Sequence, residues 1–185
     1  MIVLKTHSEL ERMKKACRIS AESLNVAEEI IRPGVTTKEI DRAMHDFIVR
    51  SGAKPSFLGL YGFPASACIS VNDVVIHGIP SDYRLENGDI VSIDVGACCD
   101  GFHGDNAYTF VVGETSEENR TLLRVTEESL YKGIEAAVVG NRIGDISNAV
   151  QSHVTPYGFG IVPQFVGHGV GKALHEEPEV PNFGR

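Results

Sequence analysis

Hydrophobic and polar positions follow helical spacing in the first third of the chain. Apolar side chains recur every three or four residues over 10–24 and again over 40–48, which predicts two amphipathic helices. Each run follows a capping-box pattern, Ser8–Glu11 for the first helix and Thr36–Glu39 for the second. A proline and a glycine at 33–34 predict where the first helix ends.

The pattern changes to period-2 alternation over residues 90–112, where two β-rich runs flank Asp100-Gly101. An Asp-Gly pair in this setting predicts a hairpin with a two-residue turn. That turn sets Gly96 opposite Asp105, and Asp94 shares the face of Gly96 because side chains alternate along a strand. Asp94 and Asp105 should therefore be diagonal neighbours across the hairpin, and the side chains that face a core should be Val91, Ile93 and Val95.

Two shorter runs, 68–71 and 74–76, are also strand-like, and the second leads into His77. They follow a glycine- and proline-bearing loop over residues 55–66. After the hairpin, a third capping-box pattern at Thr115–Glu118 predicts a helix that runs to about residue 139.

The segment 140–158 repeats the pattern of 34–52, 106 positions further along the chain, with matching glycines at both ends. The long helix before each segment repeats at a similar distance. We therefore favour a duplicated α-then-β unit over a chance likeness of two capped amphipathic helices. The chain is then expected to be one domain over 1–185, with a first half over 1–139 and the start of a second half over 140–185. With the offset of 106, Arg185 is the counterpart of Ile79 in the first half. The remainder of the second half should therefore be absent from this sequence.

Composition limits the classes of function. The chain has 185 residues, of which 42% are hydrophobic and 23% charged, as in a soluble globular protein. A formal net charge of -8 argues against nucleic acid as the main partner. No stretch is long and apolar enough for a signal peptide or a membrane span. The four cysteines lack C-x-x-C spacing, which predicts reduced thiols in a cytoplasmic protein.

The predicted position of Asp94 and Asp105 raises a chemical question. Two carboxylates aimed at one point repel each other and are costly to bury unless a cation lies between them. Hard divalent cations prefer such oxygen ligands. The hairpin alone supports two interpretations equally. The two aspartates form a metal site, or one Asp caps a turn while the other points to solvent. The histidines at 77, 168 and 175, in His-Gly-Ile-Pro, Gly-His-Gly and His-Glu-Glu-Pro segments, favour the metal.

Other motif interpretations fail. Residues 167–172 lack the P-loop spacing and are followed by Ala173 where Ser or Thr would bind magnesium. The same segment lacks the strand–helix unit of a dinucleotide site. His175 has no second His four residues on, and Pro178 would break the helix that a zincin needs. No Gly-x-Ser-x-Gly of a serine hydrolase occurs.

Three segments carry a family resemblance: YGFPASACISVNDVVIHGIP, NGDIVSIDVGACCDGFHGDNAYTF and GHGVGKALHEEP. Their order and spacing resemble those of the type I methionine aminopeptidases, and the resemblance covers essentially all 185 residues. It implies an α/β (α+β) pita-bread fold of the creatinase/aminopeptidase type, with an internal pseudo-two-fold repeat whose second half is incomplete here.

The resemblance also implies two divalent metal ions, among which Co, Mn, Fe, Zn and Ni are not distinguished. Asp94, Asp105 and His168 match three of the family's metal ligands, and its two Glu ligands would lie beyond Arg185. In the family, a metal-activated water attacks the first peptide bond.

The substrate-binding residues follow from the same resemblance. His77 and His175 match the two catalytic histidines that flank the scissile amide. Gly96 stands where the family commonly has Thr. The residues that match the apolar methionine pocket, the last two of which are also open to a plain core interpretation, are Phe57, Leu60, Phe63, Cys68 and Leu174.

The expected activity is therefore removal of the N-terminal methionine from nascent proteins by a cytoplasmic, ribosome-proximal and monomeric enzyme. The 185-residue chain alone should be weakly active or inactive, because two Glu ligands are missing. One alternative is an Xaa-Pro aminopeptidase or prolidase-like peptidase, but those carry a large N-terminal domain, whereas the first helix starts here within ten residues. The other alternative is a non-catalytic pita-bread binding protein, which the joint presence of Asp94, Asp105 and His168 disfavours.

Overall fold

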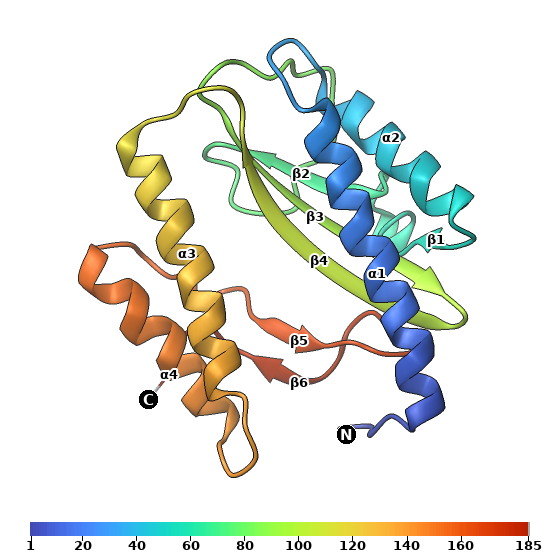
Figure 1. Cartoon of the computed structure of the whole chain (residues 1–185), viewed down its shortest axis with the longest axis vertical. Helices are drawn as coiled ribbons and strands as arrows, with labels where there is room; N and C mark the ends of the chain where they lie inside the picture. Colours follow the sequence, from blue (N-terminus) through green and yellow to red (C-terminus); the bar gives the residue numbers. More distant parts are fainter. Residues whose placement is uncertain (185) are drawn as a thin grey trace. The chain divides into compact units, whose positions relative to one another are not determined.

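The computed structural model describes residues 1–184, which form two compact units (Figure 1). The N-terminal unit comprises Val3–Thr115 together with Val170–His175. The C-terminal unit comprises Ser116–Gly169 and residues 176–184, with Met1–Ile2. The boundary that the sequence pattern predicts at 139/140 thus falls inside the C-terminal unit.

The N-terminal unit is a four-stranded antiparallel sheet with two helices. Its central strand is β3 (Ile90–Cys99), which pairs along its whole length with β4 (Phe102–Val111). Two shorter strands, β1 (Lys54–Pro55) and β2 (Ala67–Val71), also pair with β3, over residues 97–98 and 91–95 respectively. The helices are α1 (His7–Ile30) and α2 (Thr37–Arg50), and the short 3₁₀ turn η1 (Leu60–Gly62) lies between β1 and β2.

The predicted hairpin and its register are confirmed. Cys99 pairs with Phe102 and Gly96 with Asp105. Asp100 and Gly101 both have positive φ, 52° and 78°, which is the backbone conformation that a two-residue type I′ turn requires. Because a one-residue slip would turn every side chain of a strand to the other face, the turn decides which residues of β3 and β4 meet the core.

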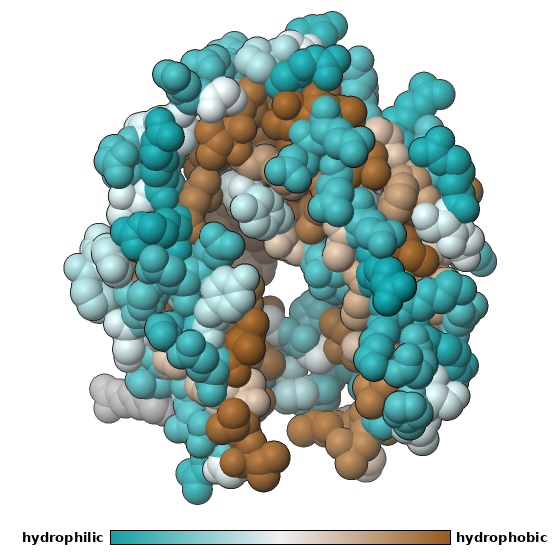
Figure 2. Space-filling view, in the orientation of Figure 1, coloured by the Kyte–Doolittle hydropathy of each residue, from teal (hydrophilic) through white to brown (hydrophobic). Residues whose placement is uncertain are grey.

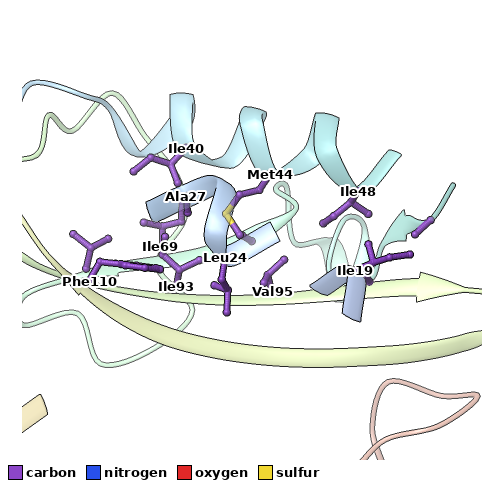
Figure 3. Close-up of a cluster of buried hydrophobic side chains, with 14 of the residues drawn as sticks. Ile19, Leu24, Ala27, Ile40, Met44, Ile48, Ile69, Ile93, Val95 and Phe110 are labelled. Carbon is purple, nitrogen blue, oxygen red and sulfur yellow. The ribbon is translucent and has the colours of Figure 1, made fainter. Parts of the chain in front are cut away.

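Helices α1 and α2 bury their apolar faces on one side of the sheet (Figure 3). Burying one such aliphatic side chain stabilises the fold by roughly 1.5–3 kcal/mol. Gly104 of β4 lets α1 approach the sheet closely, because a Cβ at this position would lie 2.4 Å from the Cα of Cys17. The buried apolar residues of the cluster include Ile19, Leu24 and Ala27 from α1, Ile40, Met44 and Ile48 from α2, and Ile69, Val91, Ile93, Val95 and Phe110 from the sheet.

Two predicted helix starts are wrong by one or two residues. The cap of α1 is Thr6, not Ser8: the Thr6 hydroxyl accepts the Glu9 N–H at 3.3 Å, and the Glu9 carboxylate accepts the Thr6 N–H at 3.0 Å. This reciprocal pair satisfies two backbone donors at once, which Ser8 inside the helix cannot do. Helix α3 (Glu117–Ala136) is capped by Ser116, not Thr115, and ends three residues before the predicted 139.

The strand predicted over residues 74–76 is also wrong. Asn72 adopts a left-handed φ of 51°, and the Val74 N–H donates to the Val71 carbonyl at 3.1 Å, so the chain turns directly after β2. The Asn72 side chain fixes that turn, since its Oδ1 accepts the Ile90 N–H at 3.0 Å and its Nδ2 donates to Asp89 at 2.8 Å. Local polar bonding therefore overrides the β propensity of the three aliphatic residues.

The C-terminal unit contains α3, α4 (Ile143–Val154), η2 (Thr155–Tyr157) and the two-stranded sheet β5 (Gly167–Gly169) with β6 (Glu176–Val180). Gly133 of α3 packs against Ile146 and Val150 of α4. Val138 and Val139, which follow α3 in the chain, are exposed. Figure 2 shows apolar atoms at the surface near the lower end of α3. Within residues 1–184, no helix is long and apolar enough to span a membrane.

Candidate metal and substrate site

The β3–β4 hairpin brings the two predicted aspartate ligands together. Asp94 pairs with Ala107, and Asp105 pairs with Gly96, so the two aspartates are diagonal neighbours on one face of the sheet, as predicted. On the opposite face Val91, Ile93 and Val95 are fully buried. The alternation therefore anchors the strand in the core and holds both carboxyl groups on the other side.

The electrostatics of this pair favour a bound cation. Burial, the negative charge of Asp105 and a hydrogen bond between the two side chains raise the pKa of Asp94 to about 7. Without a cation, the pair thus shares a proton near neutral pH, because two adjacent carboxylates cannot both ionise cheaply. A divalent cation would relieve the repulsion and take both groups as ligands, so this hard-oxygen donor pair fits a divalent metal.

The third predicted ligand, His168, lies on β5 of the C-terminal unit. Its Nδ1 lies 2.9 Å from the Gly169 carbonyl oxygen. Because a carbonyl only accepts, Nδ1 carries a proton in this contact, and in the neutral imidazole the lone pair is then on Nε2, which is the tautomer that a metal ligand needs. Among the residues that the structure describes, no three His, Cys, Asp or Glu side chains are close enough to form a metal site. The role of His168 stays a prediction.

The five predicted pocket residues form one cluster in the N-terminal unit, separate from the main core. Phe57, Cys68 and Leu174 are buried, and Leu60 and Phe63 pack against them. Cys68 pairs directly with Asp94 across the β2–β3 ladder, so this cluster adjoins the aspartate pair. Burial and the nearby charges of Asp94 and Asp105 raise the pKa of the Cys68 thiol to about 12, which keeps it neutral and apolar in character.

His77 follows β2 and is held beside it by its neighbour Gly78. The Gly78 carbonyl accepts the Ile69 N–H at 2.8 Å, and the Gly78 N–H donates to the Ser70 hydroxyl at 3.1 Å. A Cβ at Gly78 would lie 2.2 Å from the Ile69 carbonyl oxygen, so only glycine allows this approach. His77 itself has a left-handed φ of 57°, a conformation that is uncommon outside glycine and marks a constrained site.

His175 ends the segment Val170–His175, which the structure groups with the N-terminal unit. The Gly171 carbonyl accepts the His103 N–H at 2.8 Å. The Lys172 ammonium lies 2.8 Å from a Glu9 carboxylate oxygen and 5.7 Å from the centre of the Phe102 ring. Leu174 is buried in the apolar cluster, so its neighbour His175 is fixed next to that cluster by the backbone.

Two polar residues beside the site, Ser56 and His103, are not among those predicted from the sequence. The His103 Nδ1 lies 2.8 Å from the Ser56 hydroxyl oxygen, and the Ser56 N–H donates to the Gly96 carbonyl at 2.8 Å. His103 lies two residues before Asp105 on β4, so it shares the face of the aspartates. The predicted register already contained this signal, whereas the contact with Ser56 depends on the path of a loop.

The four cysteines are all free thiols, as predicted. Cys98 and Cys99 are adjacent on β3, where consecutive side chains point to opposite faces. They therefore cannot act together as a disulfide or as a shared zinc site.

Comparison with known proteins now identifies the class to which this fold and site belong. The model of metallopeptidase family M24 matches residues 11–185. The chain belongs to the M24 metallopeptidases, which are hydrolases.

Its relatives place the chain within this family. It is 58% identical over 185 residues to the methionine aminopeptidase of Clostridium perfringens, covering 100% of this chain and 74% of that protein. Against methionine aminopeptidase 1 of Bacillus subtilis it is 48% identical over 184 residues, with coverage of 100% and 74%. The chain belongs to the methionine aminopeptidase group of the family, and it spans about three quarters of the length of these relatives.

Solved structures confirm the pita-bread α/β fold. The crystal structure of methionine aminopeptidase from Rickettsia prowazekii matches with a TM-score of 0.98 and 38% identity, covering 100% of this chain and 75% of that one. Prolidase from Pyrococcus furiosus matches less closely, with a TM-score of 0.87 and 30% identity over 97% of this chain and 52% of that one. The prolidase-type alternative is therefore the weaker one.

Proposed function

We propose that this chain supplies a metal and substrate site for the removal of N-terminal methionine from nascent polypeptides. The observation that carries the proposal is the position of the apolar cluster beside the two aspartates. Cys68 of the cluster pairs with Asp94. A substrate whose apolar side chain lies in the cluster would therefore have its backbone beside the two carboxyl groups.

Asp94, Asp105 and His168 are the residues of this chain that would hold divalent metal, with two Glu ligands that the family resemblance places beyond Arg185. Bound divalent metal would lower the pKa of a coordinated water and polarise the scissile carbonyl. The aspartates would fix the metal beside the apolar cluster, so the neutral N-terminal amine of the substrate would lie close to it and cleavage would fall at the N-terminus.

The remaining residues bind and orient the substrate. The cluster of Phe57, Leu60, Phe63, Cys68 and Leu174 would accept the methionine side chain, whose flexible thioether suits an apolar pocket with aromatic walls. His175 is held next to this cluster by Leu174, and it would donate a hydrogen bond to the oxygen that becomes negative during attack. His77, held in its constrained turn, would contact the scissile amide on the other side.

The cellular setting follows from the same substrate. A nascent polypeptide offers its N-terminal methionine in the cytoplasm and near the ribosome, and we expect the enzyme to act there as a monomer. The formal net charge of -8 disfavours nucleic acid as its main partner.

Methionine release from a Met-Ala-Ser peptide, with Mn²⁺ or Co²⁺ added, tests this function. Two proteins are compared: the 185-residue chain, and the same chain fused to the part of the Clostridium perfringens relative that would follow Arg185. We expect little or no turnover by the chain alone and metal-dependent turnover by the fusion. Asp105→Asn should abolish turnover in the fusion. Turnover that survives this substitution would contradict the proposed metal site.

A further inference from the structure

The pocket loop, residues 56–66, carries three of the five residues of the apolar cluster yet has little regular structure of its own. Only the short turn η1 lies within it. Its entry is fixed on the hairpin, where the Ser56 N–H donates to the Gly96 carbonyl at 2.8 Å and the Ser56 hydroxyl lies 2.8 Å from the His103 Nδ1. The contacts at the other end of the loop, its exit at residue 66, determine how rigid the cluster is.

The exit is held by a side chain from α2. The Asp41 Oδ1 accepts the N–H groups of Ser66 and Ala67, each at 2.9 Å. One helical turn further, the His45 Nδ1 lies 2.8 Å from the Ser66 hydroxyl oxygen. Ser66 and Ala67 are 1% and 0% exposed, so neither backbone N–H has water as an alternative partner.

The contact of the Asp41 carboxylate with the N–H groups of Ser66 and Ala67, here called the clamp, should be strong. A carboxylate that accepts two backbone N–H groups forms charge-assisted bonds, which are about twice as strong as neutral ones. Burial raises the pKa of Asp41, and the two backbone bonds act against this rise. Removing the carboxylate would leave two buried donors unsatisfied, which costs far more than the loss of an ordinary surface contact.

The clamp lies directly beside the site. Ala67 pairs with Val95, and the next residue, Cys68, pairs with Asp94. A shift at Ser66 and Ala67 would therefore move both the end of the pocket loop and the cysteine that joins the apolar cluster to the aspartate pair.

We propose that Asp41 is a positioning residue that holds the apolar cluster in the shape that accepts a methionine side chain. Asp41 acts through the backbone of Ser66 and Ala67, whose N–H groups its carboxylate accepts. The proposal rests on the proposed function, because it assigns the cluster to the substrate side chain.

The test is peptide binding by the metal-free 185-residue chain, measured by NMR titration, so that it does not depend on activity. Met-Ala-Ser is compared with Gly-Ala-Ser, and the ratio of their dissociation constants reports the binding of the methionine side chain. Asp41→Ala removes the clamp, and Asp41→Asn keeps one acceptor oxygen. Asp46→Ala is the matched control, because Asp46 is exposed on the same helix.

We expect Asp41→Ala to weaken Met-Ala-Ser binding about tenfold or more and to leave Gly-Ala-Ser binding unchanged. Asp41→Asn should restore affinity to within about threefold of the original chain, and Asp46→Ala should have no effect. If Asp41→Ala does not fold, Asp41→Glu takes its place, since the longer side chain keeps the charge but displaces the loop. Equal Met-Ala-Ser affinity in the original chain and the clamp variant would overturn the proposal.

Amide hydrogen exchange separates this proposal from the proposed function. If the original chain binds both peptides equally, the assignment of the cluster to methionine is wrong. The role of the clamp is then tested by the amide exchange rates of Ala67 and Phe63. Faster exchange in Asp41→Ala, but not in Asp46→Ala, would support it, and unchanged exchange would refute it.

Discussion

The two units are built on similar helix pairs but differ in how those helices are buried. Helix α1 ends at Ile30 and α3 at Ala136, and α2 begins at Thr37 and α4 at Ile143, so both features repeat 106 positions apart. The glycines at 34, 52, 140 and 158 all have positive φ. In the N-terminal unit the helices cover a four-stranded sheet, whereas the sheet of the C-terminal unit has two strands within the described residues.

This difference shows what an amphipathic pattern determines and what it leaves open. Leu130, Tyr131 and Ile134 of α3 are 58%, 56% and 56% exposed, although α3 forms as regularly as α1. Capping and periodicity thus specify the helix locally. Burial of its apolar face depends on a partner surface, so equal patterns give unequal contributions to stability.

The largest expected effect is in the core of the N-terminal unit. Met44→Ala removes a fully buried side chain between α2 and the sheet, and it should lower the free energy of unfolding by about 2–5 kcal/mol. Denaturant unfolding followed by NMR of N-terminal-unit residues measures this loss. Val49, half exposed on the same helix, provides the matched control: a comparable loss in Val49→Ala would mean that the helix is not buried as described.

Glycine substitutions should give the next largest contrast between the units. A Cβ at Gly96 would lie 2.7 Å from the Ser56 Cβ and 2.9 Å from the Phe57 ring, whereas a Cβ at Gly160 would meet nothing within 4 Å. We expect Gly96→Ala to destabilise the chain by about 1–3 kcal/mol and Gly160→Ala to be close to neutral. Thermal unfolding of both variants provides the measurement. A neutral Gly96→Ala would show that the pocket loop does not pass so close to β3.

The aspartate pair of the N-terminal unit predicts a pH dependence of stability opposite in sign to that of Glu128 in the C-terminal unit, whose pKa is lowered by its hydrogen bond from Arg124. The pKa of Asp94, about 7, lies above its ordinary value of 3.8. The stability that Asp94 contributes is therefore complete below about pH 4 and is lost as the pH rises to about 7. In EDTA, Asp94→Asn should raise stability at pH 8 on the order of 1 kcal/mol, and less at pH 5. Melting temperatures at both pH values give the result, and an equal gain at the two pH values would count against a buried, coupled pair.

The smallest effect is expected on the exposed face of α3. Leu130→Ala should change the free energy of unfolding by less than about 0.5 kcal/mol, because the side chain is 58% exposed. Denaturant unfolding of this variant beside Met44→Ala compares the two units directly. A loss of several kcal/mol would show that this face of α3 is covered in solution.

The sequence predicts the hairpin, its register and both aspartates, because the Asp-Gly turn and period-2 alternation are local rules. The sequence misplaces the cap of α1 by two residues because Thr6–Glu9 and Ser8–Glu11 both fit the capping-box pattern, and the structure uses the first. The strand over 74–76 was wrong because the bonds of Asn72 to Asp89 and Ile90 join residues far apart in sequence.

The pocket residues show a different limit. Phe57, Cys68 and Leu174 are up to 117 positions apart, and no periodicity joins them, so they came from the family resemblance alone. The clamp of Asp41 on Ser66 and Ala67 lay beyond any local rule for the same reason. An aspartate inside an amphipathic helix resembles an ordinary solvated residue until the chain that folds over it is known.

The central claim is that Asp94 and Asp105 form a divalent metal site, and titration of Mn²⁺ into the chain tests it most directly. Isothermal calorimetry at pH 7.5 compares the original chain with Asp105→Asn and with Asp100→Asn, whose aspartate pairs with Lys15 at the tip of the same hairpin. We predict weak Mn²⁺ binding by the original chain and by Asp100→Asn, and none by Asp105→Asn. Equal Mn²⁺ binding by all three proteins would contradict the claim.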